Sequence, residues 1–110
     1  RLSLVGSEMC IRDRPWPRLL HWQTLLRARA IENQLFVVAC NRTGESGQWS
    51  FLGHSAVYDP YGEPVAEASD EETLLTAVLD LDLVDEARSS MTVFQDRNAA
   101  VYSAGSADCA

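Results

Sequence analysis

The sequence predicts a single α/β domain, and three observations lead to that class. An amphipathic helix is expected over residues 19–34, a continuous apolar run of strand length follows at 35–40, and a hairpin follows at 54–68. A helix followed at once by an uninterrupted β-branched run is typical of a sheet that is covered on both faces. With 110 residues, of which 46% are hydrophobic, the chain has the length and composition of one globular domain.

The expected helix begins after a Pro-Trp-Pro tripeptide at 15–17, where the two prolines require an extended or turning backbone. Arg29 and Glu32 are three positions apart, which is close enough for an ion pair on the helix surface. Apolar residues recur at intervals of three and four, as one face of a helix requires. The stripe consists of Leu19, Trp22, Leu26 and Ala30, widened by Leu25 and Ala28.

The apolar, β-branched run at 35–40 predicts a strand that is buried on both faces. Residues 41–50 are polar and contain glycine, so a loop is expected there. The hairpin is expected to pair residues 54–58 with residues 63–68. Between them, residues 59–62 (DPYG) place proline at the second position of a turn.

After a solvated acidic link at 69–72, residues 73–81 alternate in polarity and predict a half-buried strand. Its expected inner face consists of Leu75, Ala77, Leu79 and Leu81. Asp82 is the expected N-cap of a short helix that ends at Arg88. Residues 103–110 are expected to be a frayed tail.

Charge and cysteine content exclude several classes of protein. The net charge is −7, from 16 acidic and 9 basic residues, which argues against a nucleic-acid partner. No apolar stretch approaches the length of a membrane-spanning helix. Three cysteines without a Cys-x-x-Cys pair, and two distant histidines, give no metal-ligand spacing. An odd cysteine count without a signal peptide predicts a reducing, cytoplasmic location.

Three segments carry a family resemblance in their order and spacing. They are HWQTLLRARAIENQ at 21–34, FVVACNRTG at 36–44 and GHSAVYDPYG at 53–62. Together they closely resemble the carbon–nitrogen hydrolase (nitrilase) superfamily, downstream of its catalytic cysteine. Residues 94–102 resemble the C-terminal end of that family. The Trp-Pro start at 16–17, with His-Trp-Gln shortly after it, is most similar to the omega-amidase branch.

The resemblance implies a fold and a division of the chain. The family fold is a four-layer α-β-β-α sandwich, of which this chain would be the C-terminal portion. Residues 15–102 would then form the C-terminal part of the hydrolase domain. Residues 1–14 have no usable periodicity and look like a non-native leader, and residues 103–110 would be the tail.

The resemblance also implies covalent catalysis, in which a Cys thiolate attacks the amide or nitrile carbon. A Glu acts as general base, and a Lys stabilises the oxyanion. The chain contains no lysine, because all nine basic residues are arginine. No residue of the chain matches the family's catalytic Glu, so this segment alone is expected to be inactive. No cofactor and no metal are expected.

Two residues near the start of the chain lie close to where the family places its site. Cys10 begins CIRDRP, which resembles the elbow that carries the family's nucleophile. Only six positions separate Cys10 from Trp16, whereas a crossover between parallel strands takes a dozen or more residues. Cys10 is therefore not assigned as the nucleophile, and no catalytic residue is assigned. Trp16 is the expected substrate-binding residue, as a wall of the pocket or, alternatively, as a cover of the core edge.

Other chemically suggestive residues have structural interpretations. Cys40 ends the expected buried strand and would be an inert hydrophobe. His54 and Ser55 are adjacent on an expected strand and point to opposite faces, so they cannot form a triad with Asp59. Arg29 and Glu32 are expected to be a scaffold ion pair. Trp49 is expected in the loop at 41–50, as a lid or an interface residue.

The sequence is therefore interpreted as a fragment of a cytoplasmic, thiol-dependent carbon–nitrogen hydrolase. The full-length enzyme would be an omega-amidase that releases ammonia from a small carboxamide acid. It is expected to be a homo-oligomer with no nucleic-acid or membrane partner. The alternative is a non-catalytic α/β interaction domain, whose helix at 19–34 serves oligomerisation.

Overall fold

Helix α2 (Arg18–Asn33) is the first element of the computed structural model, which describes residues 18–105 and the side chains of residues 18–102. The predicted apolar stripe faces the protein interior, since Trp22 and Ala30 are buried and Leu26 is half-buried. The predicted widening of that stripe is wrong. Leu25 is 42% exposed and Ala28 is exposed, because both lie on the opposite face of the helix from the sheet.

The C-terminal end of α2 is formed by a residue in the left-handed conformation. Gln34 has φ 50°, and the next amide, of Leu35, donates a hydrogen bond to the carbonyl of Ala30 at 3.2 Å. This arrangement satisfies a carbonyl that the last helical turn leaves without a partner. The helix therefore ends where the sequence predicted.

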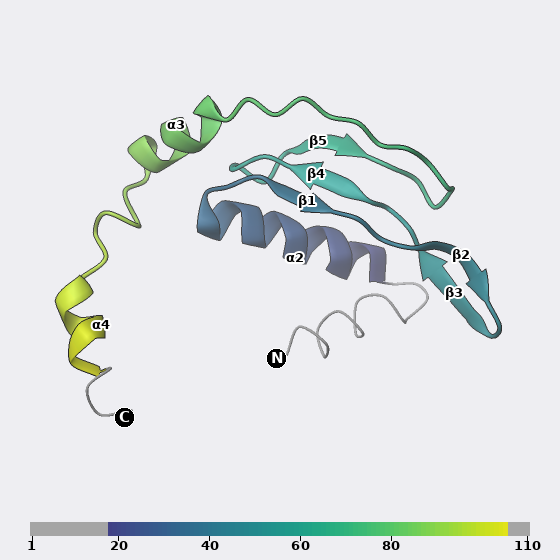
Figure 1. Cartoon of the computed structure of the whole chain (residues 1–110), viewed down its shortest axis with the longest axis horizontal. Coiled ribbons are helices and arrows are strands. Elements are labelled where there is room, and N and C mark those ends of the chain that lie inside the picture. Colours follow the sequence, from purple (N-terminus) through teal and green to yellow (C-terminus); the bar gives the residue numbers. More distant parts are fainter. Residues whose placement is uncertain (1–17, 106–110) are drawn as a thin grey trace.

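Three short strands form one antiparallel sheet in the order β1-β4-β5. They are β1 (Val37–Ala39), β4 (Ala56–Tyr58) and β5 (Pro64–Glu67). Helix α2 lies along one face of this sheet (Figure 1). The buried core between helix and sheet consists of Ala30, Ala56 and Tyr58, with Leu26 and Val37 packed against it.

The prediction that the run at 35–40 is buried on both faces is wrong. Only residues 37–39 pair as a strand, and Val38 is 67% exposed. Within the described residues, β1 is at the edge of its sheet and α2 covers one face only. A continuous apolar run is typical of a strand that is covered on both faces of its sheet. The run at 35–40 therefore fits a sheet with more covering elements than the described residues supply.

The predicted loop at 41–50 is also wrong, because most of it forms a second, two-stranded sheet. Strands β2 (Thr43–Ser46) and β3 (Trp49–Leu52) pair antiparallel, with Ser46 opposite Trp49. Gly47 follows β2 with φ 61°, and a two-residue hairpin turn needs positive φ at its first position. This hairpin projects beyond the main sheet in Figure 1.

The hairpin of β4 and β5 confirms the predicted turn at 59–62. The amide of Gly62 donates to the carbonyl of Asp59 at 2.9 Å, and proline occupies the second position. The Asp59 carboxylate accepts two further bonds, from the amides of Tyr61 and Glu63, both at 2.9 Å. These bonds satisfy the turn's donors locally.

The strand predicted at 73–81 is absent. Its residues follow an extended path without strand pairing in the described part of the chain, and Leu74 and Val78 are 90% and 92% exposed. Of the expected inner face, Leu75 and Leu79 are half-buried, whereas Ala77 and Leu81 are exposed. An alternating pattern becomes a strand only where a neighbour accepts its hydrogen bonds, and none does so here.

Two short helices complete the described chain, α3 (Asp82–Ser90) and α4 (Ala99–Gly105). The prediction that Asp82 caps α3 is wrong by one residue, because Leu81 occupies the N-cap position. Asp82 lies in the first turn, and its amide donates to the carboxylate of Asp80 at 3.1 Å. Helix α4 reaches Gly105, within the stretch expected to be a tail.

The helices between residues 18 and 105 are all too short or too polar to span a lipid bilayer.

Candidate functional site

A polar pocket of about 370 Å³ lies at the C-terminal end of β1. Antiparallel pairing brings three chain segments together there, because Ala39 lies opposite Ala56, which in turn lies opposite Glu67. The end of β1, the approach to β4 and the exit from β5 therefore meet at one edge of the sheet. The pocket is lined by Cys40, Asn41, Arg42, Thr43, Ser55, Ala68, Ser69, Glu71, Glu72 and Thr73.

Asn41 ties the end of β1 to the loop before β4. Its side-chain amide donates to the carbonyl of Gly53 at 2.8 Å, and its side-chain oxygen accepts from the amide of Arg42 at 3.0 Å. Its backbone amide donates to the hydroxyl of Ser55 at 2.9 Å. Asn41 is 8% exposed, so these bonds form in a largely water-free environment. The pocket wall is therefore rigid on this side.

Helix α2 holds the same loop from below the sheet. The indole of Trp22 donates to the carbonyl of His54 at 2.8 Å, and the amide of His54 donates to the carbonyl of Ser69 at 3.0 Å. His54 has φ 55°, in the left-handed region that few non-glycine residues adopt. The neighbouring Gly53 has φ 68° and packs so closely that a Cβ there would lie 3.0 Å from Asp70 and Thr43. The loop therefore accepts little rearrangement.

The pocket contains one thiol, from Cys40. The prediction that Cys40 is buried is wrong, because the residue is exposed and its thiol is free. Two carboxylates, Glu71 and Glu72, also line the pocket. The catalytic lysine that the resemblance implies is absent, because this chain contains no lysine. The described pocket is therefore not a complete catalytic centre.

The Ser-His-Asp letters at 54–59 do not form a triad, although the reason differs from the predicted one. His54 and Ser55 precede β4, so the alternation of a strand does not separate them. Instead, the Ser55 hydroxyl is bound to the backbone of Asn41, and the Asp59 carboxylate is bound in its turn. The hydroxyl and the carboxylate of the three residues thus have structural partners on the backbone.

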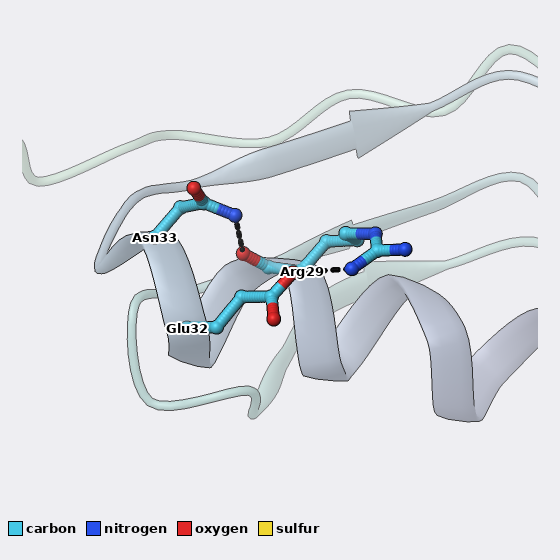
Figure 2. Close-up of polar contacts among 3 residues, drawn as sticks. All are labelled: Arg29, Glu32 and Asn33. Carbon is cyan, nitrogen blue, oxygen red and sulfur yellow. Dashed lines mark hydrogen bonds and ion pairs between the residues drawn. The ribbon is translucent and has the colours of Figure 1, made fainter. Parts of the chain in front are cut away.

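Arg29 and Glu32 form the predicted ion pair on the solvent side of α2 (Figure 2). Their side chains are 64% and 53% exposed, so the pair contributes little to stability. In the next turn, the side chain of Asn33 donates to the carbonyl of Arg29 at 2.9 Å. The contacts are those of a helix surface.

A second polar cluster lies between α2 and the sheet, around the fully buried Tyr58. The Tyr58 hydroxyl donates to Glu67 at 2.8 Å, and the guanidinium of Arg27 lies 5.4 Å from the ring centroid. Burial raises the pKa of Tyr58, as do the hydrogen bond and the negative charge of Glu67, while Arg27 opposes them. This phenol therefore acts as a hydrogen-bond donor in the core.

The other residues singled out from the sequence either lie outside the described part of the chain or do not line the pocket. Cys10 and Trp16 lie outside the described residues. Trp49 is 52% exposed on β3 and does not line the pocket. Residues 18–102 contain no group of three metal-binding side chains. Asn41 and Arg42 were not predicted as site residues, although an amide and a guanidinium directly after a strand could have indicated them.

A helix-covered sheet with a polar pocket at one end of its strands is typical of an α/β domain that handles small molecules. A model of the carbon–nitrogen hydrolase family matches residues 2–89. The chain therefore belongs to the carbon–nitrogen hydrolase family, as the resemblance implied. The match includes residues 2–14, and their assignment as a non-native leader stays a prediction.

Several curated relatives of the chain are amidases. A 2-oxoglutaramate amidase of Paenarthrobacter nicotinovorans is 45% identical over 105 residues, covering 94% of this chain and 36% of the relative. A 2-oxoglutaramate amidase of Bacillus subtilis is 49% identical, covering 80% of this chain and 34% of the relative. The omega-amidase YafV of Escherichia coli is 44% identical over 86% of this chain. The chain thus spans about a third of these relatives' length.

Solved structures bear out the predicted α/β fold class as part of a nitrilase-like fold. A CN-hydrolase superfamily protein of Xanthomonas campestris aligns with a TM-score of 0.71 and 39% identity. That alignment covers 79% of this chain and 33% of the other. The NitFhit protein of Caenorhabditis elegans aligns with a TM-score of 0.69 and 46% identity, over 76% of this chain and 21% of the other.

Proposed function

We propose that the chain is part of an omega-amidase that hydrolyses a small carboxamide acid and releases ammonia. The observation that carries the proposal is the 45–49% identity to two 2-oxoglutaramate amidases across most of the chain. A rigid polar pocket of about 370 Å³ at the end of β1 supports it, because the volume suits a small, polar substrate.

In this proposal the chemistry is shared between this chain and the rest of the enzyme. The catalytic Cys, Glu and Lys that the family uses would lie in the other two-thirds of the polypeptide. The described residues would contribute a fixed wall, in which Asn41 and Trp22 hold the loop at 53–55. Trp16 stays a proposed substrate contact. A pre-formed wall lowers the entropic cost of placing the substrate near the nucleophile.

The same proposal includes a cytoplasmic homo-oligomer. Its support is the outer face of α2, where Leu20 and Leu25 are 67% and 42% exposed. Ala28 lies on that face and would allow close approach of a second helix. Exposed aliphatic side chains gathered on one helix favour an interface.

The experiment is a graft. Residues 18–102 replace the matching segment of the Bacillus subtilis relative, and ammonia release from 2-oxoglutaramate is measured. The ungrafted relative and a graft whose nucleophilic Cys is changed to Ala are the controls. We expect turnover by the graft and none by its Cys→Ala variant. A graft that folds, as judged by circular dichroism, but releases no ammonia contradicts the proposal.

The second candidate is a non-catalytic interaction domain, favoured by the same exposed face of α2. It predicts that Leu20→Ser with Leu25→Ser abolishes self-association of the chain and that the folded graft has no amidase activity. The omega-amidase proposal predicts an active graft. Ammonia release therefore distinguishes the two.

A further inference from the structure

Arg42 is the cation among the residues that line the pocket at the C-terminal end of β1. It directly follows Asn41, between β1 and the projecting hairpin of β2 and β3. The other basic side chains that the structure describes line no part of this pocket. Any anion that enters it therefore meets Arg42 as its positive partner.

Three contacts fix Arg42. Its amide donates to the side chain of Asn41 at 3.0 Å, and its carbonyl accepts from the amide of Gly53 at 2.9 Å. Its guanidinium lies over the ring of Phe51, 4.1 Å from the centroid. Stacking uses the face of a guanidinium and leaves the N–H groups at its edge available. The two hydrogen bonds thus fix the backbone of Arg42, and the stacking on Phe51 orients its guanidinium with the side-chain donors uncommitted.

No carboxylate within residues 18–102 forms an ion pair with Arg42, in a chain that has 16 acidic residues. Glu71 and Glu72 line the same pocket but do not pair with it. Arg29, by comparison, pairs with Glu32 on an open helix surface. A fixed guanidinium beside a pocket, without an internal counter-ion, suits a carboxylate supplied from outside.

We propose that Arg42 binds the carboxylate of the carboxamide acid and so selects acids over neutral amides. The inference rests on the proposed amidase function, and it names the residue that recognises the carboxylate of the substrate. The planar guanidinium would form two parallel hydrogen bonds with the carboxylate. Phe51, which stacks on the guanidinium, and Asn41, which binds the Arg42 backbone amide, are positioning residues.

Glu71 and Glu72 oppose carboxylate binding in this pocket. Their negative charges in the same pocket disfavour an anion that is not held by Arg42. Replacing both by glutamine is therefore expected to tighten carboxylate binding to the Arg42 protein. It should not restore binding where Arg42 is absent.

The test is a titration of the 110-residue chain with glutaramate and, separately, with the neutral diamide glutaramide, followed by ¹⁵N NMR. We expect saturable shifts at Arg42 and Asn41 with glutaramate and none with glutaramide. Arg42→Gln should weaken glutaramate binding at least about tenfold, the loss expected for a charge-assisted hydrogen bond. Arg42→Lys keeps the charge without the planar fork and should fall between the two.

Arg88→Gln is the matched control. Arg88 also stacks on an aromatic ring, with its guanidinium 5.2 Å from the centroid of Phe94, but it lies outside the pocket. Arg88→Gln should bind glutaramate like the parent chain. Equal losses in both variants, equal binding of the diamide, or no saturable shift at Arg42 would overturn the inference.

Turnover separates this inference from the proposed function. In an active graft, Arg42→Gln should raise the KM for 2-oxoglutaramate about tenfold and leave kcat nearly unchanged. If the graft is active and Arg42→Gln leaves its KM unchanged, the role of Arg42 is contradicted and the amidase function is not. If the graft is inactive but the chain still binds glutaramate through Arg42, the amidase function is contradicted and the role of Arg42 is not.

Discussion

Asn41 organises the pocket through its side-chain nitrogen, its side-chain oxygen and its backbone amide. Its amide nitrogen satisfies a buried carbonyl of Gly53, and its oxygen orients the backbone of Arg42. Water has little access to these groups, so their loss leaves polar atoms without partners. At the scale of one residue, the pocket therefore depends on a side chain that need not contact substrate.

We expect Asn41→Ala to lower the free energy of unfolding by about 1–3 kcal/mol, the cost of a buried polar group without a partner. Asn33→Ala is the control, because Asn33 also donates to a backbone carbonyl but in an exposed position. That change should cost about 0.5 kcal/mol. Urea unfolding followed by circular dichroism measures both, and equal losses would show that burial at Asn41 is unimportant.

The raised pKa of Tyr58 predicts that the stability of the fold depends on pH in the alkaline range. Burial and Glu67 raise its pKa above the ordinary 10.0, so the folded state holds the proton more tightly than the unfolded state. The stability from this shift is complete below pH 10 and is lost as the pH rises through the folded-state pKa. Thermal unfolding from pH 8 to pH 11 should show the loss in the parent chain.

Tyr58→Phe should remove this part of the alkaline loss, because phenylalanine has no titrating hydroxyl. Tyr61→Phe, at a tyrosine that is 46% exposed, is the control and should keep it. The assignment to Tyr58 does not survive if Tyr58→Phe has the same alkaline profile as the parent chain.

At the scale of elements, the β4–β5 turn locks onto α2. Gly62 has φ 81°, and a Cβ there would lie 2.7 Å from the side chain of Ile31. The turn can approach the helix this closely because glycine has no side chain. Gly44 on β2 has a similar φ of 85°, but a Cβ there would meet nothing within 4 Å.

A comparison of Gly62→Ala with Gly44→Ala therefore distinguishes steric crowding against α2 from backbone strain at positive φ. Both changes carry about 1 kcal/mol of strain for a side chain at positive φ. Gly62→Ala should cost about 1–3 kcal/mol more, because the turn must move away from the helix. Denaturant midpoints measure the difference. Equal losses would mean that the turn and helix adjust freely.

The extended segment at 73–81 presents aliphatic side chains to solvent. Leu74 and Val78 are almost fully exposed, so Leu74→Ser with Val78→Ser should change the unfolding free energy by less than about 0.5 kcal/mol. The same pair should reduce self-association and dye binding, because an exposed apolar strand favours pairing between chains. Leu75→Ser with Leu79→Ser, at half-buried positions, should instead lower stability. Analytical ultracentrifugation and thermal unfolding measure these effects, and unchanged self-association would contradict the first expectation.

The whole molecule is open for its size. Its radius of gyration is 17.4 Å, whereas a compact chain of this length has about 13 Å. Its accessible surface is 8276 Å², against about 6,100 Å² for a compact protein of this mass. Figure 1 shows α4 away from the helix-covered sheet, whereas the side chain of Gln34, at the end of α2, donates to the carbonyls of Ala87 and Met91 and so holds α3. These dimensions fit a chain that spans a third of its relatives.

At this scale we expect the purified 110-residue chain to release no ammonia from glutaramate. It has no lysine to stabilise an oxyanion, and losing such a group costs orders of magnitude in rate. A coupled ammonia assay measures this, with the Bacillus subtilis relative as the active control. Turnover that Cys10→Ala or Cys40→Ala abolishes would contradict the expectation.

The sequence by itself determined the family, helix α2 and the β4–β5 hairpin, because these depend on local signals. The intervals between Leu19, Trp22, Leu26 and Ala30 define a helix face, and a DPYG tetrapeptide defines a turn. The tertiary structure decided which apolar segments find partners. Residues 73–81 alternate like a strand yet stay unpaired, and Val38 is exposed within an apolar run, since burial depends on what neighbours the fold supplies. The pocket also depends on the tertiary structure, because the antiparallel register of β1, β4 and β5 brings Arg42, Ser55 and Ser69 to one edge of the sheet.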